Sequence, residues 1–171
     1  MPEENQIHST LFAVQGSIAW ITLNRPEKRN ALNDELIADV KSGLRAAAEE
    51  PLVRAVVISG AGKDFCSGAD LSALQKISKA TITENADDAR SMMELFMLMR
   101  ELPIPVIAAV HGRALAGGCG LASAADLVLA AESARFGYPE VKLGFVPAMV
   151  MAILKRNVSE KQAFELLTRG G

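Results

Sequence analysis

Two short glycine-rich segments follow predicted β-strands, and in both the groups that could take part in a reaction are backbone N–H donors. The first is residues 65–71 (Phe-Cys-Ser-Gly-Ala-Asp-Leu) and the second is residues 112–120 (Gly-Arg-Ala-Leu-Ala-Gly-Gly-Cys-Gly). The apolar runs before them, at 55–59 and 106–110, are typical of buried strands. Where a strand turns into a helix, the first N–H groups have no partner inside the helix, and the helix dipole favours negative charge there. Two such turns side by side on one sheet can supply both donors of an oxyanion hole.

Each turn also has a simpler interpretation. Ser67-Gly68-Ala69 is compatible with a plain turn, and Gly117-Gly118 with close packing of a helix on a strand, because glycine is common at such places. The functional interpretation makes the N–H groups of Ala69 and Gly117 donors to a developing negative oxygen. On sequence pattern alone, the simpler interpretation is favoured at both turns.

Glu140 is the candidate acid or base. It follows Pro139, and its apolar neighbours are Val141, Leu143 and Phe145. A carboxylate desolvated by such neighbours has a raised pKa, which suits proton transfer near neutral pH. The alternative is a surface glutamate paired with Lys142, and taken alone the residue type favours that alternative.

Other motifs point away from phosphate-loop and metal chemistry. Residues 60–63 (Gly-Ala-Gly-Lys) lack the spacer and the Ser/Thr of a phosphate-binding loop. His8 and His111 lack metal-ligand spacing, so no metal site is predicted. Cys66 and Cys119 are interpreted as reduced thiols of a cytoplasmic protein.

Length and composition predict one globular domain over residues 1–171. The chain is 50% hydrophobic and 22% charged, enough for a substantial core. A net charge of −2 gives no attraction to nucleic acid or to anionic membranes. No apolar run reaches transmembrane length, and the polar, acidic first eleven residues do not resemble a targeting peptide. We therefore expect a cytoplasmic protein with no nucleic-acid or membrane partner.

Strands alternate with helices along the chain, which predicts an α/β fold with a largely parallel sheet. The expected strands are 11–14, 18–23, 53–59, 106–110, 127–130 and 135–138. The expected helices are one capped by Asn33 and closed by Pro51, then 86–102, 117–125, 147–154 and 160–168. The polar segment 72–85 is expected to be partly mobile.

Taken in order, these pieces resemble the crotonase superfamily of enoyl-CoA hydratases and isomerases. The matching stretches are 21–33, 65–71, 108–126 and 134–147. The resemblance implies a crotonase-like spiral of repeated ββα units. It also implies that this chain lacks the usual C-terminal helical segment, which in the family covers the acyl pocket and helps build a homotrimer or hexamer.

The resemblance further implies an acyl-CoA thioester substrate, in which coenzyme A belongs to the substrate and no separate cofactor is needed. Ala69 and Gly117 match the family's oxyanion donors, and Glu140 matches its acid/base residue. Segments 24–31 and 67–71 would line the coenzyme A path. The residues expected to bind substrate are Lys28, Arg29, Ala31, Ser67, Gly68, Ala69, Asp70, Leu71 and Gly117.

One departure from the family pattern affects the mechanism. Typical hydratases of the family carry a second glutamate after the Gly-Gly-Cys stretch, where this chain has Gly120. The leading expectation is still addition of water to a 2-enoyl-CoA through an oxyanion-stabilised enolate. The alternatives are isomerisation of 3-enoyl-CoA to 2-enoyl-CoA by Glu140 alone, hydrolysis of a β-hydroxyacyl-CoA, and a non-catalytic acyl-CoA-binding role.

Overall fold

The computed structural model describes residues 5–7, 9–70 and 79–170. The strands are β1 (Asn5–Ile7), β2 (Thr10–Gln15), β3 (Ile18–Leu23), β4 (Ala55–Gly60), β5 (Val106–Val110), β6 (Arg113–Leu115), β7 (Leu127–Ala130) and β8 (Arg135–Gly137). The helices are η1 (Pro26–Lys28), α1 (Asp34–Glu49), α3 (Ile82–Glu101), α4 (Gly117–Ala124), η2 (Pro139–Leu143), α5 (Ala148–Asn157) and α6 (Glu160–Arg169), of which η1 and η2 are 3₁₀ helices.

The main sheet has the strand order β1-β2-β3-β4-β5-β7. Its first three strands are antiparallel, and β3, β4, β5 and β7 run parallel. β2 and β3 form a hairpin, with Gly16 in the left-handed region at φ 61°. Parallel strands need long crossovers, and α1 and α3 provide two of them. The predicted α/β fold with a largely parallel sheet is therefore confirmed.

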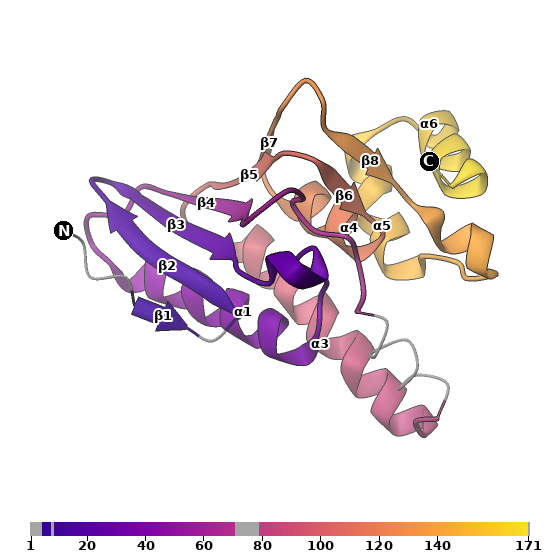
Figure 1. Ribbon diagram of the computed structural model, residues 1–171, viewed down its shortest axis with the longest axis horizontal. Helices are drawn as coiled ribbons and strands as arrows, with labels where there is room; N and C mark the ends of the chain where they lie inside the picture. The colour runs from indigo at the N-terminus through magenta and orange to yellow at the C-terminus, as the bar shows by residue number, and fades with distance from the viewer. Residues whose placement is uncertain (1–4, 8, 71–78, 171) are drawn as a thin grey trace.

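The main core lies between this sheet and the helices α1 and α3, which run side by side along the sheet (Figure 1). Ala19, Ile21 and Leu23 alternate along β3 and are buried. The capping prediction for α1 is also confirmed, because Asn33 Oδ1 accepts a hydrogen bond from Leu36 N–H at 2.9 Å. This layer is the rigid platform for the loops at the ends of β4 and β5.

Helix α3 begins at Ile82, four residues before the predicted start. Thr81 and Glu84 form a capping box, in which each side chain accepts a hydrogen bond from the other residue's backbone N–H. This reciprocal cap explains why a polar segment is helical from Ile82 onward, where partial mobility was expected. The rest of that segment, residues 72–78, lies outside the described residues.

A smaller parallel pair, β6 with β8, leads the chain into the candidate site. β6 was not predicted, since it has only three residues and directly follows Gly112 in the left-handed region. Figure 1 shows α4, α5 and α6 gathered at the C-terminal end, on the far side from β1. Because β6 pairs with β8, the segments that follow them, α4 after β6 and η2 after β8, start next to each other.

Candidate active site

The two glycine-rich loops lie side by side. Cys66 N–H donates to Arg113 O at 3.0 Å, and Leu115 N–H donates to Cys66 O at 3.0 Å. These two hydrogen bonds form an isolated parallel bridge between Cys66 and Ala114. The two segments are therefore adjacent, and the second one contains the short strand β6 between β5 and α4.

Glycine is required where the loops press together. Gly68 has φ 97°, and a Cβ built there would lie 2.7 Å from the Cβ of Ala116. A Cβ at Gly118 would lie 2.4 Å from Cys66 O, closer than any real side chain tolerates. The N-terminus of α4 can reach the first loop only because both positions lack side chains.

The amide of Ala69 is oriented by a second isolated bridge, to Leu32. Leu32 N–H donates to Gly68 O at 2.7 Å, and Asp70 N–H donates to Leu32 O at 2.9 Å. Both hydrogen bonds use the N–H and C=O of Leu32 itself and the groups that flank Ala69, so in this parallel pairing the N–H of Ala69 faces the other way. The N–H of Ala69 is thereby turned away from Leu32.

The amide of Gly117 is the first of α4, so it has no partner inside the helix. The preceding residue, Ala116, has φ 52° and ψ −126°, a conformation that costs a non-glycine residue about 1–3 kcal/mol. It is held there because Ala116 N–H donates to Gly137 O at 2.9 Å and Gly120 N–H donates to Ala116 O at 3.0 Å. Within the described part of the chain, the turn and loop hydrogen bonds include none donated by the backbone N–H of Ala69 or Gly117.

Glu140 lies in η2 with one carboxylate oxygen, Oε2, buried and without a hydrogen-bond partner among the described residues. Burial raises the pKa of Glu140, as predicted from its apolar neighbours. The ion pairs of the described chain include none between Glu140 and Lys142. A desolvated carboxyl group, rather than a paired surface glutamate, is the arrangement found.

One cavity of about 440 Å³ brings the predicted groups together: Ala69, Gly117, Glu140 and Ser67 all line it. Its remaining wall is mainly apolar and comes from α3, from the segment joining η2 to α5, and from the first turn of α5. The main apolar residues are Met92, Phe96, Phe145, Val146, Met149 and Val150. Two backbone turns and one carboxyl group thus face a space suited to an apolar molecule that carries a polar reacting centre.

Other predicted binding residues lie outside this lining. Lys28 and Arg29 are exposed at η1, and Ala31 is buried beside it. Gly68 supports the loop packing described above, and Leu71 lies outside the described residues.

Asp70 was predicted to line the substrate path, but its carboxylate faces Arg25. Asp70 Oδ2 lies 2.9 Å from Arg25 Nη2, and both side chains are mostly buried. Arg25 Nη1 also donates to the carbonyl oxygen of Ala31. Arg25 was not identified from the sequence, because an arginine before a proline carries no local signal of a long-range ion pair.

Position 120, where the family resemblance implies a second glutamate in hydratases, is closely packed by side chains. A Cβ at Gly120 would lie 2.8 Å from Val150 Cγ2 and 3.2 Å from Phe96 Cζ. Both neighbours line the cavity. Along this wall of the cavity the second carboxylate is replaced by packed hydrocarbon.

Asn30 was also not singled out, and it is fully buried with φ 53°. Its Oδ1 accepts from Arg25 N–H at 2.9 Å, and its Nδ2 donates to Ala61 O at 2.9 Å and Asp64 O at 2.8 Å. Asparagine tolerates the left-handed region better than most residues. This side chain joins the turn around Arg25 to the loop that follows β4.

The two cysteines are poor nucleophiles in this fold. Burial raises the pKa of Cys66 to about 12, and burial also raises the pKa of Cys119. Across residues 5–7, 9–70 and 79–170, His, Cys, Asp and Glu form no group of three that could hold a metal ion. In the same residues no helix is long and apolar enough to cross a membrane.

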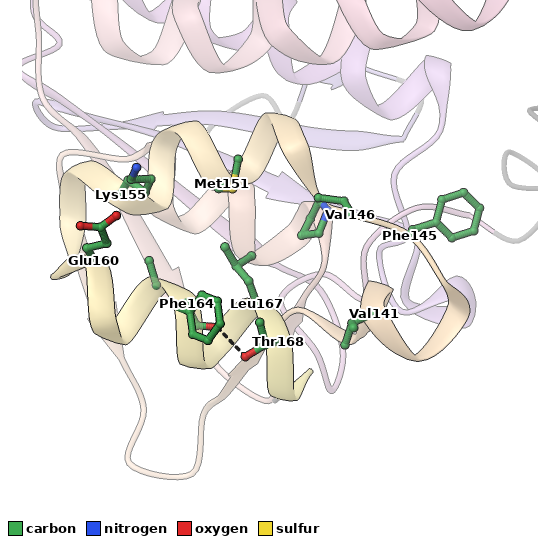
Figure 2. Close-up of a pocket in the computed structure, with 11 residues that line it drawn as sticks. Val141, Phe145, Val146, Met151, Lys155, Glu160, Phe164, Leu167 and Thr168 are labelled. Atoms are coloured by element: carbon green, nitrogen blue, oxygen red, sulfur yellow. Dashed lines mark hydrogen bonds between the residues drawn. The ribbon is translucent and has the colours of Figure 1, made fainter.

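A second apolar cavity, of about 350 Å³, lies between α5, α6 and η2. Its lining includes Met151 and Lys155 of α5 and Phe164 and Leu167 of α6, which Figure 2 labels on the two neighbouring helices. The two cavities share Phe145, Val146 and Pro147 as lining residues. The segment before α5 is therefore a common wall between them.

The fold and the cavity describe an α/β protein with the spiral of a crotonase. Residues 13–171 match the family model described as enoyl-CoA hydratase/isomerase, and the chain belongs to that family. A Thermus thermophilus protein assigned as an enoyl-CoA hydratase is 46% identical over 91% of this chain. A zebrafish (Danio rerio) mitochondrial protein, enoyl-CoA hydratase domain-containing protein 3, is 37% identical over 94% of it.

Solved structures agree. The crystal structure of an enoyl-CoA hydratase from Shewanella pealeana superimposes with a TM-score of 0.93 at 28% identity, over 98% of this chain and 63% of that one. The chain spans 62% of the Thermus protein and 55% of the zebrafish protein. The predicted membership of the crotonase superfamily is confirmed.

Proposed function

We propose that this chain acts on an acyl-CoA thioester, with the N–H groups of Ala69 and Gly117 binding the thioester oxygen and Glu140 transferring a proton beside it. The observation that carries the proposal is that these three groups, from three separate segments, line one cavity. The buried Oε2 of Glu140, without a protein partner among the described residues, is the atom that would exchange the proton.

The chemistry follows from where charge develops. Removing a proton from C2 of an acyl thioester leaves an enolate, whose negative charge resides largely on the thioester oxygen. Two fixed N–H groups stabilise that oxygen without reorganisation, and loss of one such donor typically costs about 3 kcal/mol. Burial raises the pKa of Glu140, which makes it a stronger base once ionised.

A single carboxylate is sufficient to isomerise a 3-enoyl-CoA to a 2-enoyl-CoA. Glu140 takes the proton from C2, and the electron pair extends the conjugation onto the thioester oxygen. The double bond then moves from C3–C4 to C2–C3 as the same carboxyl group returns the proton to C4. No second acid is needed, which agrees with the packing of Val150 and Phe96 against Gly120.

Hydration of a 2-enoyl-CoA is the second candidate, and it is favoured by the names of the relatives. Here Glu140 would take a proton from water as the oxygen adds to C3, and the same carboxyl group would return a proton to C2.

For substrate binding, Ser67 lines the cavity, and Lys28 and Arg29 remain proposed contacts of the coenzyme A phosphates.

Three substrates assayed side by side test the proposal: a 3-enoyl-CoA, crotonyl-CoA and a β-hydroxyacyl-CoA. We expect a double-bond shift as the fastest reaction, and E140Q should lower it by about 10²- to 10⁴-fold, the usual contribution of a general base. Glu132, which is exposed, gives the matched control E132Q with unchanged rates. Full activity in E140Q would refute the assignment of the base. Thioester binding without any turnover would indicate a non-catalytic binding role.

A further inference from the structure

We infer that Arg25 and Asp70 are positioning residues for the Ala69 oxyanion donor, acting by cross-linking the two short segments whose bridge orients that amide. The inference rests on the proposed function, because it concerns how one of the proposed donors is held in place.

The bridge between Leu32 and Ala69 is isolated and belongs to none of the strands in the described part of the chain. Its two backbone hydrogen bonds involve Leu32 on one side, and Gly68 and Asp70 on the other. Gly68 is in the left-handed region, a conformation that gives this loop no regular structure of its own. A third backbone hydrogen bond, from Ser67 N–H to Arg29 O at 3.0 Å, joins the same two segments before the bridge. At Asp70, on the other side of Ala69, the side chain of Arg25 adds a further link.

The guanidinium of Arg25 contacts both segments at once. Its Nη1 donates to the carbonyl oxygen of Ala31, the residue before Leu32. Its Nη2 donates to Asp70 Oδ2 at 2.9 Å, on the residue after Ala69. The planar fork of an arginine suits two contacts in a fixed geometry, which a lysine cannot reproduce.

The Arg25–Asp70 pair is largely shielded from water, and the backbone of Arg25 is held by a further hydrogen bond. The side chains of Arg25 and Asp70 are 16% and 12% exposed, so solvent screens this pair less than a surface pair. The backbone N–H of Arg25 donates to the buried Asn30 side chain. Neither Arg25 nor Asp70 is among the described residues that line the cavity, so their effect on substrate passes through the Ala69 loop.

The sharpest test compares two ligands, because a misplaced oxyanion donor weakens binding of an enolate more than binding of a neutral thioester. The probes are a β-ketoacyl-CoA, which binds as its enolate and is followed by the enolate's ultraviolet band, and a saturated acyl-CoA of equal length. A displacement of about 1 Å can cost about a hundredfold in rate. We expect R25M and D70A to lower kcat and enolate affinity by about tenfold or more, with saturated acyl-CoA affinity within about threefold.

D70N keeps an oxygen that accepts from Arg25 and should restore most of the loss. The matched control is D39A, which removes another buried carboxylate; Asp39 Oδ2 accepts from Ser9 N–H at 2.6 Å, away from this loop. It should lower stability and leave the ratio of the two affinities unchanged. If R25M does not fold, the comparison of D70A with D70N decides the question alone.

Equal loss of both affinities in R25M and D70A would overturn the inference in favour of a general effect on the fold. Unchanged affinities would overturn it too. In both cases a wild-type protein that binds the enolate and an E140Q variant that has lost activity would leave the proposed function standing. A wild-type protein that binds neither probe would refute the proposed function, and the inference with it.

Discussion

Val150 of α5 fills the space next to Gly120 of α4: a Cβ at Gly120 would lie 2.8 Å from Val150 Cγ2. The ring of Phe96 closes the same space from α3, at 3.2 Å. Among the described lining residues Glu140 is therefore the one carboxylate, and the place where a second could stand is filled by the side chains of Val150 and Phe96. A side chain at position 120 would have to push aside Val150 and Phe96, which line the cavity.

This contact predicts an unusual response to alanine. In a helix interior, Gly→Ala normally stabilises by about 1 kcal/mol. Here the added methyl group overpacks the contact with Val150, which costs about 1–3 kcal/mol, so we expect G120A to lower the free energy of unfolding. V150A removes the clashing methyl groups, and the two substitutions should be coupled by about 1 kcal/mol. Urea unfolding of both single variants and the double variant measures this coupling; a G120A protein more stable than the wild type would contradict it.

The desolvated carboxyl group of Glu140 predicts a pH dependence of stability. Burial raises its folded-state pKa above the unfolded value. Between those two values the folded protein binds more protons than the unfolded chain, so the free energy of unfolding falls as pH rises through this window. E140Q carries no such proton, so this part of the fall should be missing. Above the folded pKa the variant should be more stable than the wild type.

Unfolding measured across the pH range from about 4 to 8 checks this expectation, since the window starts near the ordinary carboxyl pKa. The acidic limb of kcat/KM should lie above that ordinary value for the same reason, because Glu140 works in its ionised form. E132Q again serves as the control and should follow the wild-type curve. Wild-type and E140Q stabilities that stay parallel at every pH would show that Glu140 is as well solvated when folded as when unfolded.

The sequence allowed residues that meet at one cavity to be singled out where the signal is local. Glycine at positions 68 and 117 and an apolar neighbourhood at Glu140 are properties of short segments, and the structure places all three segments around one cavity. The start of α3 was also readable, because Thr81 and Glu84 have capping-box spacing. It was missed because the polar composition of the segment was given more weight than its cap.

Hydrogen-bond partners that are distant in the sequence could not be predicted from it. Arg25 meets Asp70 across 45 positions of the chain, and Asn30 meets Asp64 across 34. A polar residue near a turn looks the same whether it faces solvent or a distant backbone carbonyl. Asp70 was predicted to contact substrate from the family resemblance of residues 67–71, and the structure shows its carboxylate paired with Arg25.

The pair Asp64–Arg113 predicts a further effect on the two loops. Asp64 is buried and accepts from Arg113 N–H at 3.0 Å, from Nε at 2.8 Å and, through its other oxygen, from Nη2 at 2.8 Å. The side-chain hydrogen bonds from Arg113 lower the pKa of Asp64. This arrangement ties the first loop, just before Phe65, to the start of β6.

Because the folded-state pKa of Asp64 is lowered, its stabilising effect is fully present above the unfolded pKa and is lost as pH falls through the folded pKa. We expect D64N to reduce the free energy of unfolding by about 1–3 kcal/mol at neutral pH, a range that allows for the partial exposure of Arg113. The difference from the wild type should shrink in acid. The exposed pair Asp87–Arg90 provides the control D87N, which should change stability by about 0.5 kcal/mol or less. Because Asp64 joins the two loops, D64N should also lower kcat more than D87N does. Equal effects of the two variants on stability and on kcat would show that the Asp64–Arg113 pair does not fix the position of the loops.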